Sequence, residues 1–484
     1  MVGGVVGGLV VAGTAVVAAA EVVAVLPPSD PEHAASTARS DTAARHHLVE
    51  HRMQGRTYCS LVAGRSRLAC RAVPGSRRRR AALALAGLVL AACTSSNGTT
   101  ASTTLPAAPT TVATTANSST TTVTSTGAPT TTTVHLDTAN VYGYAGANML
   151  SPSVAGARPL VYVPSAAQGG RGFVDIIDPA TMTVVDRFEA GSISQHVVPS
   201  WDLKTLYVTA SAGNQLVPID PMTGKPGAPI KASRPYNLYF TPDGTKAVVQ
   251  NEQNNRIDYY DTATWTLQKS VPSTCSGNNH ADWSADGTYF IVTCEFSGDL
   301  IKVDTQTGDV VAIINLAPGA MPQDVRLMPD GKAFYVADMM SDGVWIVDGA
   351  TMTVQGQIPT GVGAHGIYPS RDAKYMYVSN RGRHMGDERR RSRPGEGSVS
   401  VVDPTTNQVV ATWTIPDGGS PDMGGVSADG TRLWLSGRYD SEVYVFDTAT
   451  GALVGRIPTD PSPHGLAVWP QPGRYSLGHT GNTR

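Results

Sequence analysis

From about residue 158 to residue 470, short runs of apolar or alternating residues are separated by turns rich in Gly, Pro and Asp. Seven of these runs end in an aspartate with a threonine three positions later, at Asp178, Asp220, Asp261, Asp304, Asp348, Asp403 and Asp447. An Asp that accepts backbone N–H groups two or three residues on favours a tight turn. Runs of this length, ending in such turns, predict short β-strands.

A second element repeats in phase with the first. Apolar or aromatic pairs such as Tyr162-Val163, Tyr207-Val208 and Tyr335-Val336 precede each aspartate, and four of them follow an Asp-Gly turn, at 243–244, 286–287, 330–331 and 429–430. Asp-Gly between two strands is a strong hairpin signal. Each repeat therefore reads as strand, tight turn, strand, loop, strand, Asx turn, strand.

The spacing of the repeat sets the architecture. Successive aspartates are separated by 42, 41, 43, 44, 55 and 44 residues. Four short antiparallel strands in about 42 residues, repeated seven times, predict an all-β, seven-bladed β-propeller. The repeats begin on a second strand, at 160–163, and end on an extra first strand, at 464–468. We expect these two strands to share one blade, which removes the open sheet edge.

The repeat resembles the YVTN, or YncE-like, family of seven-bladed propellers. The match is carried by YVT at 207–209, YVSN at 377–380 and VSVVD at 399–403, and it extends over all seven repeats. The resemblance implies the propeller fold and an exported or surface-attached protein, without specifying an activity. The repeat is also similar to that of the haem d1 domain of cytochrome cd1 nitrite reductase and of other periplasmic redox propellers.

Composition narrows the functional classes. The chain has 484 residues, a formal net charge of -2, 50 Gly and 33 Pro. A near-neutral chain lacks the Lys/Arg excess that phosphate contacts need, so no nucleic-acid partner is expected. Length alone suggests about three domains, but the repeat count assigns residues 136–484 to one propeller, and we expect a monomer.

The segment before the propeller contains features of an export signal. Four arginines at 77–80 precede an apolar run of signal-peptide length, and Leu-Ala-Ala-Cys at 90–93 resembles a bacterial lipobox. Residues 77–92 are therefore predicted to be a lipoprotein signal peptide, with Cys93 as the lipidated residue. The membrane is then a partner through Cys93, and the protein is expected to be exported and anchored on the outer face of the bacterial cytoplasmic membrane.

Two further segments flank this signal. Residues 1–76 are longer than a lipoprotein leader requires. The preferred interpretation is an over-extended gene start, with translation beginning nearer Met53 or Val73. The apolar run at 1–26 can also be read as a membrane helix or a second signal peptide. Residues 93–135 are predicted to be a disordered tether, because 24 of the 41 residues at 94–134 are Ser or Thr and none is charged.

One polar position recurs just before the first strand of each repeat. The seven residues are His196, Asn237, His280, Asp324, His365, Asp422 and His464. First strands surround the central channel of a propeller, so we predict that this set, the hub ring, converges at one mouth of the channel and binds a ligand. The four histidines are candidate ligands of a transition metal such as copper, iron or zinc. The alternative is that the ring caps strands and lines a solvated funnel.

Two other features bear on partners and stability. Cys275 and Cys294 flank the Asp-Gly hairpin of the third repeat, and an exported address permits a disulfide between them; two free thiols or a soft metal ligand beside His280 are the alternatives. The long fifth interval carries six arginines between Arg381 and Arg393. This stretch is either a solvated loop or a surface for an envelope protein, a polysaccharide or another anionic partner.

Two functional hypotheses remain. The first is a lipid-anchored binding or interaction module at the cell envelope, with an unknown ligand. The second is a metal- or cofactor-dependent periplasmic redox or hydrolytic enzyme that uses the hub ring. The sequence contains no P-loop, G-x-S-x-G, H-E-x-x-H or C-x-x-C-H motif.

Overall fold

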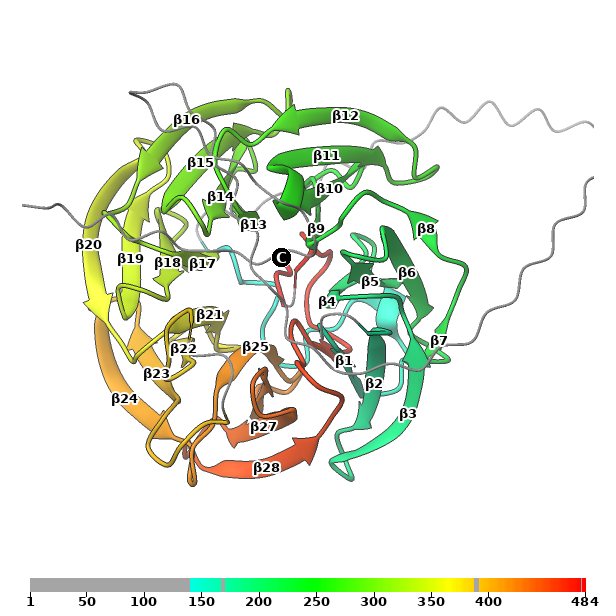
Figure 1. Ribbon diagram of the computed structural model, residues 1–484, viewed down its shortest axis with the longest axis vertical. Helices are drawn as coiled ribbons and strands as arrows, with labels where there is room; N and C mark the ends of the chain where they lie inside the picture. The colour runs from blue at the N-terminus through cyan, green and yellow to red at the C-terminus, as the bar shows by residue number, and fades with distance from the viewer. Residues whose placement is uncertain (1–139, 167–169, 387–390, 480) are drawn as a thin grey trace, which may run out of the picture. The chain divides into compact units, whose positions relative to one another are not determined.

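The computed structural model describes residues 140–166, 170–386, 391–479 and 481–484. Its strands form seven antiparallel sheets, which surround a central axis as the blades of a propeller (Figure 1). Two short 3-10 helices, η1 (Pro152–Val154) and η2 (Glu252–Asn254), interrupt the strands. The predicted signal peptide, Cys93 and the Ser/Thr-rich tether lie outside the described residues. Within the described ranges, no helix is long and apolar enough to span a membrane.

Six blades follow the chain in order, from the innermost strand outward. They are β4 (Ser194–Pro199), β5 (Leu206–Ala210), β6 (Gln215–Asp220), β7 (Lys225–Pro226) and β8 (Ile230–Lys231); β9 (Asn237–Phe240), β10 (Lys246–Asn251), β11 (Arg256–Asp261) and β12 (Leu267–Pro272); β13 (Asn278–Trp283), β14 (Tyr289–Cys294), β15 (Asp299–Asp304) and β16 (Val310–Asn315); β17 (Pro322–Leu327), β18 (Ala333–Asp338), β19 (Gly343–Asp348) and β20 (Thr353–Pro359); β21 (Ala364–Pro369), β22 (Met376–Asn380), β23 (Ser398–Asp403) and β24 (Gln408–Thr414); and β25 (Pro421–Val426), β26 (Arg432–Gly437), β27 (Glu442–Asp447) and β28 (Leu453–Pro458).

The seventh blade joins the two ends of the repeat array. It consists of β29 (Ala467–Trp469), β1 (Leu160–Pro164), β2 (Phe173–Asp178) and β3 (Thr183–Glu189). Strand β29 pairs with β1 in antiparallel register, with Val468 opposite Val161. The predicted closure is confirmed, and it removes the free edges that an open ring would leave.

Burial explains how the blades hold together. The second strand of each blade is buried along nearly its whole length, whereas outer strands such as β3 and β24 are mostly exposed. Seven apolar clusters fill the interfaces between neighbouring blades; Trp283 and Tyr239, for example, join β13 to β9. The fold is therefore stabilised mainly by face-to-face packing of sheets.

The repeated aspartates make the turns that the sequence predicts. Asp261 Oδ1 accepts a hydrogen bond from the backbone N–H of Thr264, at 2.8 Å, and Asp304 Oδ1 accepts one from Thr307, at 2.7 Å. These bonds lower the pKa of both aspartates below the ordinary value. Each turn thus links the third strand of its blade to the fourth.

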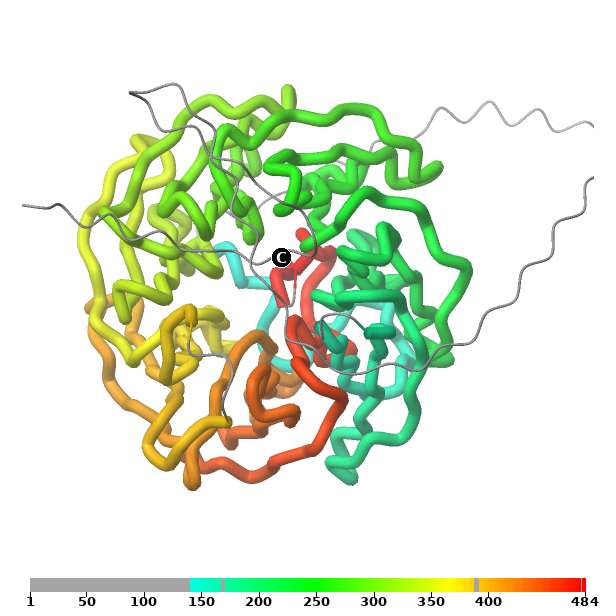
Figure 2. Tube along the Cα trace, in the orientation of Figure 1, coloured from blue at the N-terminus to red at the C-terminus, as the bar shows by residue number. Residues whose placement is uncertain are grey.

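A hairpin formed by residues 473–479 and 481–484, here called the central hairpin, occupies the middle of the ring (Figure 2). It runs along the innermost strand β9: the backbone N–H of Phe240 donates to the carbonyl of Leu477, and the N–H of His479 donates to that of Leu238. Asn482 and Arg484 both donate to Oδ1 of the buried Asp282, at 2.9 Å. The channel of this propeller is therefore filled by its own chain.

Candidate functional site

The hub ring comes from the innermost strands, but most of its residues lie within those strands and not just before them, and the ring lies deeper than predicted. His464 precedes β29, and the other six residues lie in the innermost strands of the remaining blades. All seven side chains are buried, with at most 1% of each residue exposed. The structure therefore places the ring inside the channel and not on an open rim.

Local backbone geometry turns these side chains toward the axis. In five blades the pairing of the first two strands shifts register at the hub position; in β4, for example, the shift lies between Ser194 and Val197 and so brackets His196. A β-bulge of this kind interrupts the regular alternation of faces and re-aims a side chain. The recurring polar residue is thus presented to the channel by the same irregularity in each of these blades.

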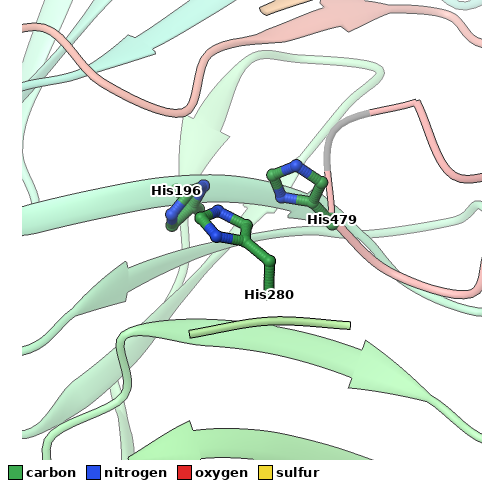
Figure 3. Close-up of side chains that lie close together, drawn as sticks. All are labelled: His196, His280 and His479. Atoms are coloured by element: carbon green, nitrogen blue, oxygen red, sulfur yellow. The ribbon is translucent and has the colours of Figure 1, made fainter. Parts of the chain in front are cut away.

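The ring separates into two groups, and the first includes a histidine from outside the repeats. His196 and His280 lie beside His479, which the central hairpin supplies (Figure 3). One ring nitrogen from each lies within 4.8 Å of the others. The ring centroids are 4.9 to 5.3 Å apart, and the rings meet edge to face. Three imidazoles, two from blade strands and one from the central hairpin, therefore converge inside the channel.

Hydrogen bonding differs within this group. Among the described residues, neither ring nitrogen of His196 and neither of His280 has a hydrogen-bond partner. His479 is held in place: Nδ2 of Asn237 lies 3.1 Å from its Nδ1, and Oδ1 of Asp324 lies 3.7 Å from its Nε2. A buried polar group without a partner costs about 1–3 kcal/mol, so the four unpaired nitrogens mark an incomplete site.

The second group is charged. Oδ1 of Asp422 lies 2.9 Å from Nδ1 of His365 and 2.7 Å from Nη2 of Arg381, and its Oδ2 lies 3.6 Å from Nε2 of His464. Burial by itself raises the pKa of Asp422, but the Arg381 guanidinium, His365 and His464 together outweigh it and hold that pKa well below the usual range. Asp422 is therefore a buried carboxylate paired with an arginine.

The histidines of both groups are neutral at neutral pH. Burial lowers the pKa of His196 to about 3 and that of His365 to about 4. The same cause lowers the pKa values of His280, His464 and His479 well below the usual range. Neutral imidazole is the form that coordinates metal ions.

An acidic pair lies near these groups. Glu252 is in η2, and Glu295 directly follows β14 and accepts a hydrogen bond from Asn279 at 3.0 Å. Burial, together with the neighbouring Glu295, raises the pKa of Glu252 to about 8, and burial also raises that of Glu295. This pair therefore tends to retain a proton at neutral pH.

The arginine-rich loop differs from a fully solvated segment. Arg381 and Arg383 are 5% and 2% exposed, whereas Arg391 and Arg393 are exposed. Arg389 and Arg390 lie outside the described residues. Nη2 of Arg383 donates to Ser392 Oγ at 2.7 Å, within the loop itself. Two of the six arginines thus belong to the interior.

Cys275 and Cys294 form a disulfide, with their Cα atoms 6.0 Å apart. Cys294 pairs with Asn278 at the end of the β13–β14 ladder, which brings it next to the strand entered from Cys275. The bridge ties the second strand of this blade to the segment leading into its first strand. Neither cysteine is then available as a thiolate that binds a metal ion beside His280.

Sequence reasoning identified the hub ring and missed His479, Glu252 and Glu295. The two glutamates occupy a recurring position, since Glu252, Glu295, Arg381 and Arg438 are each the first residue after a second strand. That second recurring polar position was a readable signal. His479 lies outside the repeat and had no comparable signal.

Together, the closed ring of seven sheets and the polar hub define a seven-bladed β-propeller with a filled channel. A family model described as YNCE-like beta-propeller matches residues 145–472. The chain belongs to the YNCE-like β-propeller family, as its repeat suggested.

Comparison with other proteins adds the fold alone. No curated protein matches the sequence. A protein of unknown function from Desulfotomaculum acetoxidans is 17% identical, with a TM-score of 0.50, over 63% of this chain and 98% of that one. Hydrazine synthase of Kuenenia stuttgartiensis is 18% identical, with a TM-score of 0.46, over 55% and 86%. NirN, a dihydro-haem d1 dehydrogenase, is 15% identical, with a TM-score of 0.46, over 70% and 77%.

Proposed function

We propose that this propeller is a lipid-anchored binding module of the bacterial cell envelope, and that it engages an anionic partner through the loop at 381–397. The observation that carries the proposal is the attachment of this loop to the body of the propeller. The described parts of this basic loop, 381–386 and 391–397, are tied to neighbouring residues, and so they present the exposed Arg391 and Arg393 in a defined place. Such presentation reduces the ordering cost of binding.

Three contacts fix the loop. Arg381 pairs with Asp422 at one end, and Ser392 donates from both its N–H and its hydroxyl to Asp440, at 2.9 and 2.7 Å. Between them, Nε2 of His384 lies 2.7 Å from Oδ1 of Asp342, on the neighbouring blade. The exposed Arg391 and Arg393 therefore lie on an anchored surface.

Site-specific photo-cross-linking in cells tests the partner. A photoreactive residue replaces Arg393 on the loop or, as a control, Val311, which is 57% exposed on the outer strand β16. We expect adducts from position 393 only, and fewer of them at high ionic strength, because salt screens exposed charges. The same adducts from both positions, or none from 393, contradict the proposed binding surface.

The anchor is tested separately. The lipobox around Cys93 supports lipidation, and a protein with two or three acyl chains fractionates with membranes. Labelling with an alkyne fatty acid should therefore mark the wild-type chain, and Cys93→Ala should abolish the label and release the propeller. An unlabelled wild-type chain, or a label retained in the variant, contradicts the anchor without bearing on the binding surface.

A further inference from the structure

We infer that His196, His280 and His479 form a three-imidazole binding site for one transition-metal ion of the Zn²⁺ or Cu²⁺ class, which the central hairpin completes. The inference goes beyond the proposed binding module. It differs from the four-histidine set expected from sequence, because His479 joins the site while His365 and His464 group with Asp422.

The first argument is the unused coordination capacity of the rings. A neutral imidazole has one lone-pair nitrogen, and those of His196 and His280 have no hydrogen-bond partner in the described part of the chain. Edge-to-face ring contacts fill space but leave the nitrogen unsatisfied. A metal ion bound between the rings would use one lone pair from each of the three.

The second argument is the spacing. Zn–N bonds of ~2.0–2.1 Å in tetrahedral geometry place ligand nitrogens about 3.3–3.4 Å apart. The three nitrogens already lie within 4.8 Å of one another, so small side-chain rotations bring them to bonding distance. Donors of nitrogen alone favour zinc or copper over Mg²⁺ and Ca²⁺, which prefer oxygen ligands.

The third argument is the support around His479. Nδ2 of Asn237 lies within hydrogen-bond distance of its Nδ1, at 3.1 Å, whereas Oδ1 of Asp324 lies 3.7 Å from its Nε2, close to that nitrogen but beyond hydrogen-bond distance. A carboxylate beside the second nitrogen of a histidine ligand orients the ring and increases its basicity. If Nδ1 of His479 is the atom that binds the metal ion, the hydrogen bond from the Asn237 amide to that atom is lost, while Asp324 stays next to Nε2 of His479.

The fourth argument is how the site is built. His196 and His280 come from β4 and β13, whereas His479 comes from the tip of a hairpin whose backbone pairs with β9 between them. An ion would therefore connect three separate parts of the propeller. A metal ion that binds only the folded state stabilises it by RT ln(1 + c/Kd), where c is the free metal concentration, so the stabilisation grows with that concentration.

Metal titration of the full-length protein tests the site. After removal of metal with a chelator, Zn²⁺ and Cu²⁺ are added separately, with Mg²⁺ as a control, and binding is followed by calorimetry and elemental analysis. We expect one tightly held Zn²⁺ or Cu²⁺ per chain and a higher melting temperature, with no effect of Mg²⁺. Failure of the wild-type chain to retain one equivalent of either ion overturns the inference.

Variants assign the ion to this site. His280→Gln and His479→Gln should each weaken binding by more than about 100-fold, because even the loss of a second-shell partner costs ~10–100-fold. His384→Ala is the matched control, since His384 is partly exposed and pairs with Asp342. Circular dichroism confirms that each variant is folded, and His479→Gln, on the hairpin, leaves the blade strands intact. Binding that survives both Gln variants, or that His384→Ala abolishes, overturns the assignment.

Discussion

Nη2 of Arg381 lies 2.7 Å from Oδ1 of Asp422, and the two side chains are only 6% and 0% exposed. Arg381 directly follows β22, and Asp422 lies in the bulge of β25, so the pair joins two neighbouring blades. It also fixes the first residue of the inserted loop. One ion pair therefore connects the hub, the blade interface and the proposed partner surface.

Replacement of Arg381 by Met should destabilise the protein by about 3–5 kcal/mol, because it leaves the buried Asp422 carboxylate without its main counter-charge. The measurement is the free energy of unfolding in urea. Arg393→Met, on the exposed part of the same loop, is the control and should change stability by no more than about 0.5 kcal/mol. Equal effects of the two substitutions would show that the buried pair has no special role.

The disulfide should contribute about 3 kcal/mol, because it closes a loop with a sequence separation of 19. The double variant Cys275→Ala/Cys294→Ala removes the bridge without leaving a free thiol. We expect its urea midpoint to fall accordingly, with little change in the native circular dichroism spectrum. Peptide mapping of the unreduced wild-type protein provides the check: two free thiols at these positions would contradict the bridge.

The fold was predictable because each blade of a propeller is formed by a short, local sequence pattern that repeats along the chain. Strand, Asp-Gly turn and Asx turn recur about every 42 residues, and the incomplete repeats at the two ends predict the pairing of β1 with β29. The hub positions follow from the same phase. Each can be read from neighbouring residues alone, without knowledge of long-range contacts.

The filled channel was not predictable in this way. His479 contacts Asn237 across 242 positions, and it lies in a segment with no strand periodicity. The hub is buried and that hairpin pairs with β9 beside it, whereas the repeat alone predicts an open mouth. Similarly, Arg381 reads as one of six loop arginines until the blade geometry brings it to Asp422, 41 positions later.

The pH dependence of stability provides a test of the acidic pair. The pKa of Glu252 is raised to about 8 in the folded protein, mainly by burial, whereas glutamate in an unfolded chain has a pKa of about 4.3. The folded state thus binds the proton more tightly. The resulting contribution to the stability of the folded state is fully present below about pH 4.3 and is lost as the pH rises to about 8. Glu252→Gln should therefore become progressively more stable than wild type between pH 5 and 8.

Glu189→Gln is the matched control for this experiment. A hydrogen bond from Arg171 lowers the pKa of Glu189. The contribution of Glu189 to the stability of the folded state is therefore present above about pH 4.3 and is lost at lower pH. The melting temperature of this variant relative to wild type should not rise between pH 5 and 8. A Glu252→Gln difference that stays constant over this range would show that Glu252 is ionised throughout.

The central hairpin should stabilise the folded protein, because its apolar side chains pack in the same clusters as those of the blades. Leu477 is 1% exposed and packs in the same apolar cluster as Trp283, so Leu477→Ala should cost about 2–5 kcal/mol. Leu267→Ala is the control, because Leu267 is 48% exposed on the outer strand β12 and its loss should cost no more than about 0.5 kcal/mol. Urea unfolding measures both. If Leu477→Ala is as mild as Leu267→Ala, the hairpin does not pack in the channel in solution, and the histidine cluster that depends on it is not formed either.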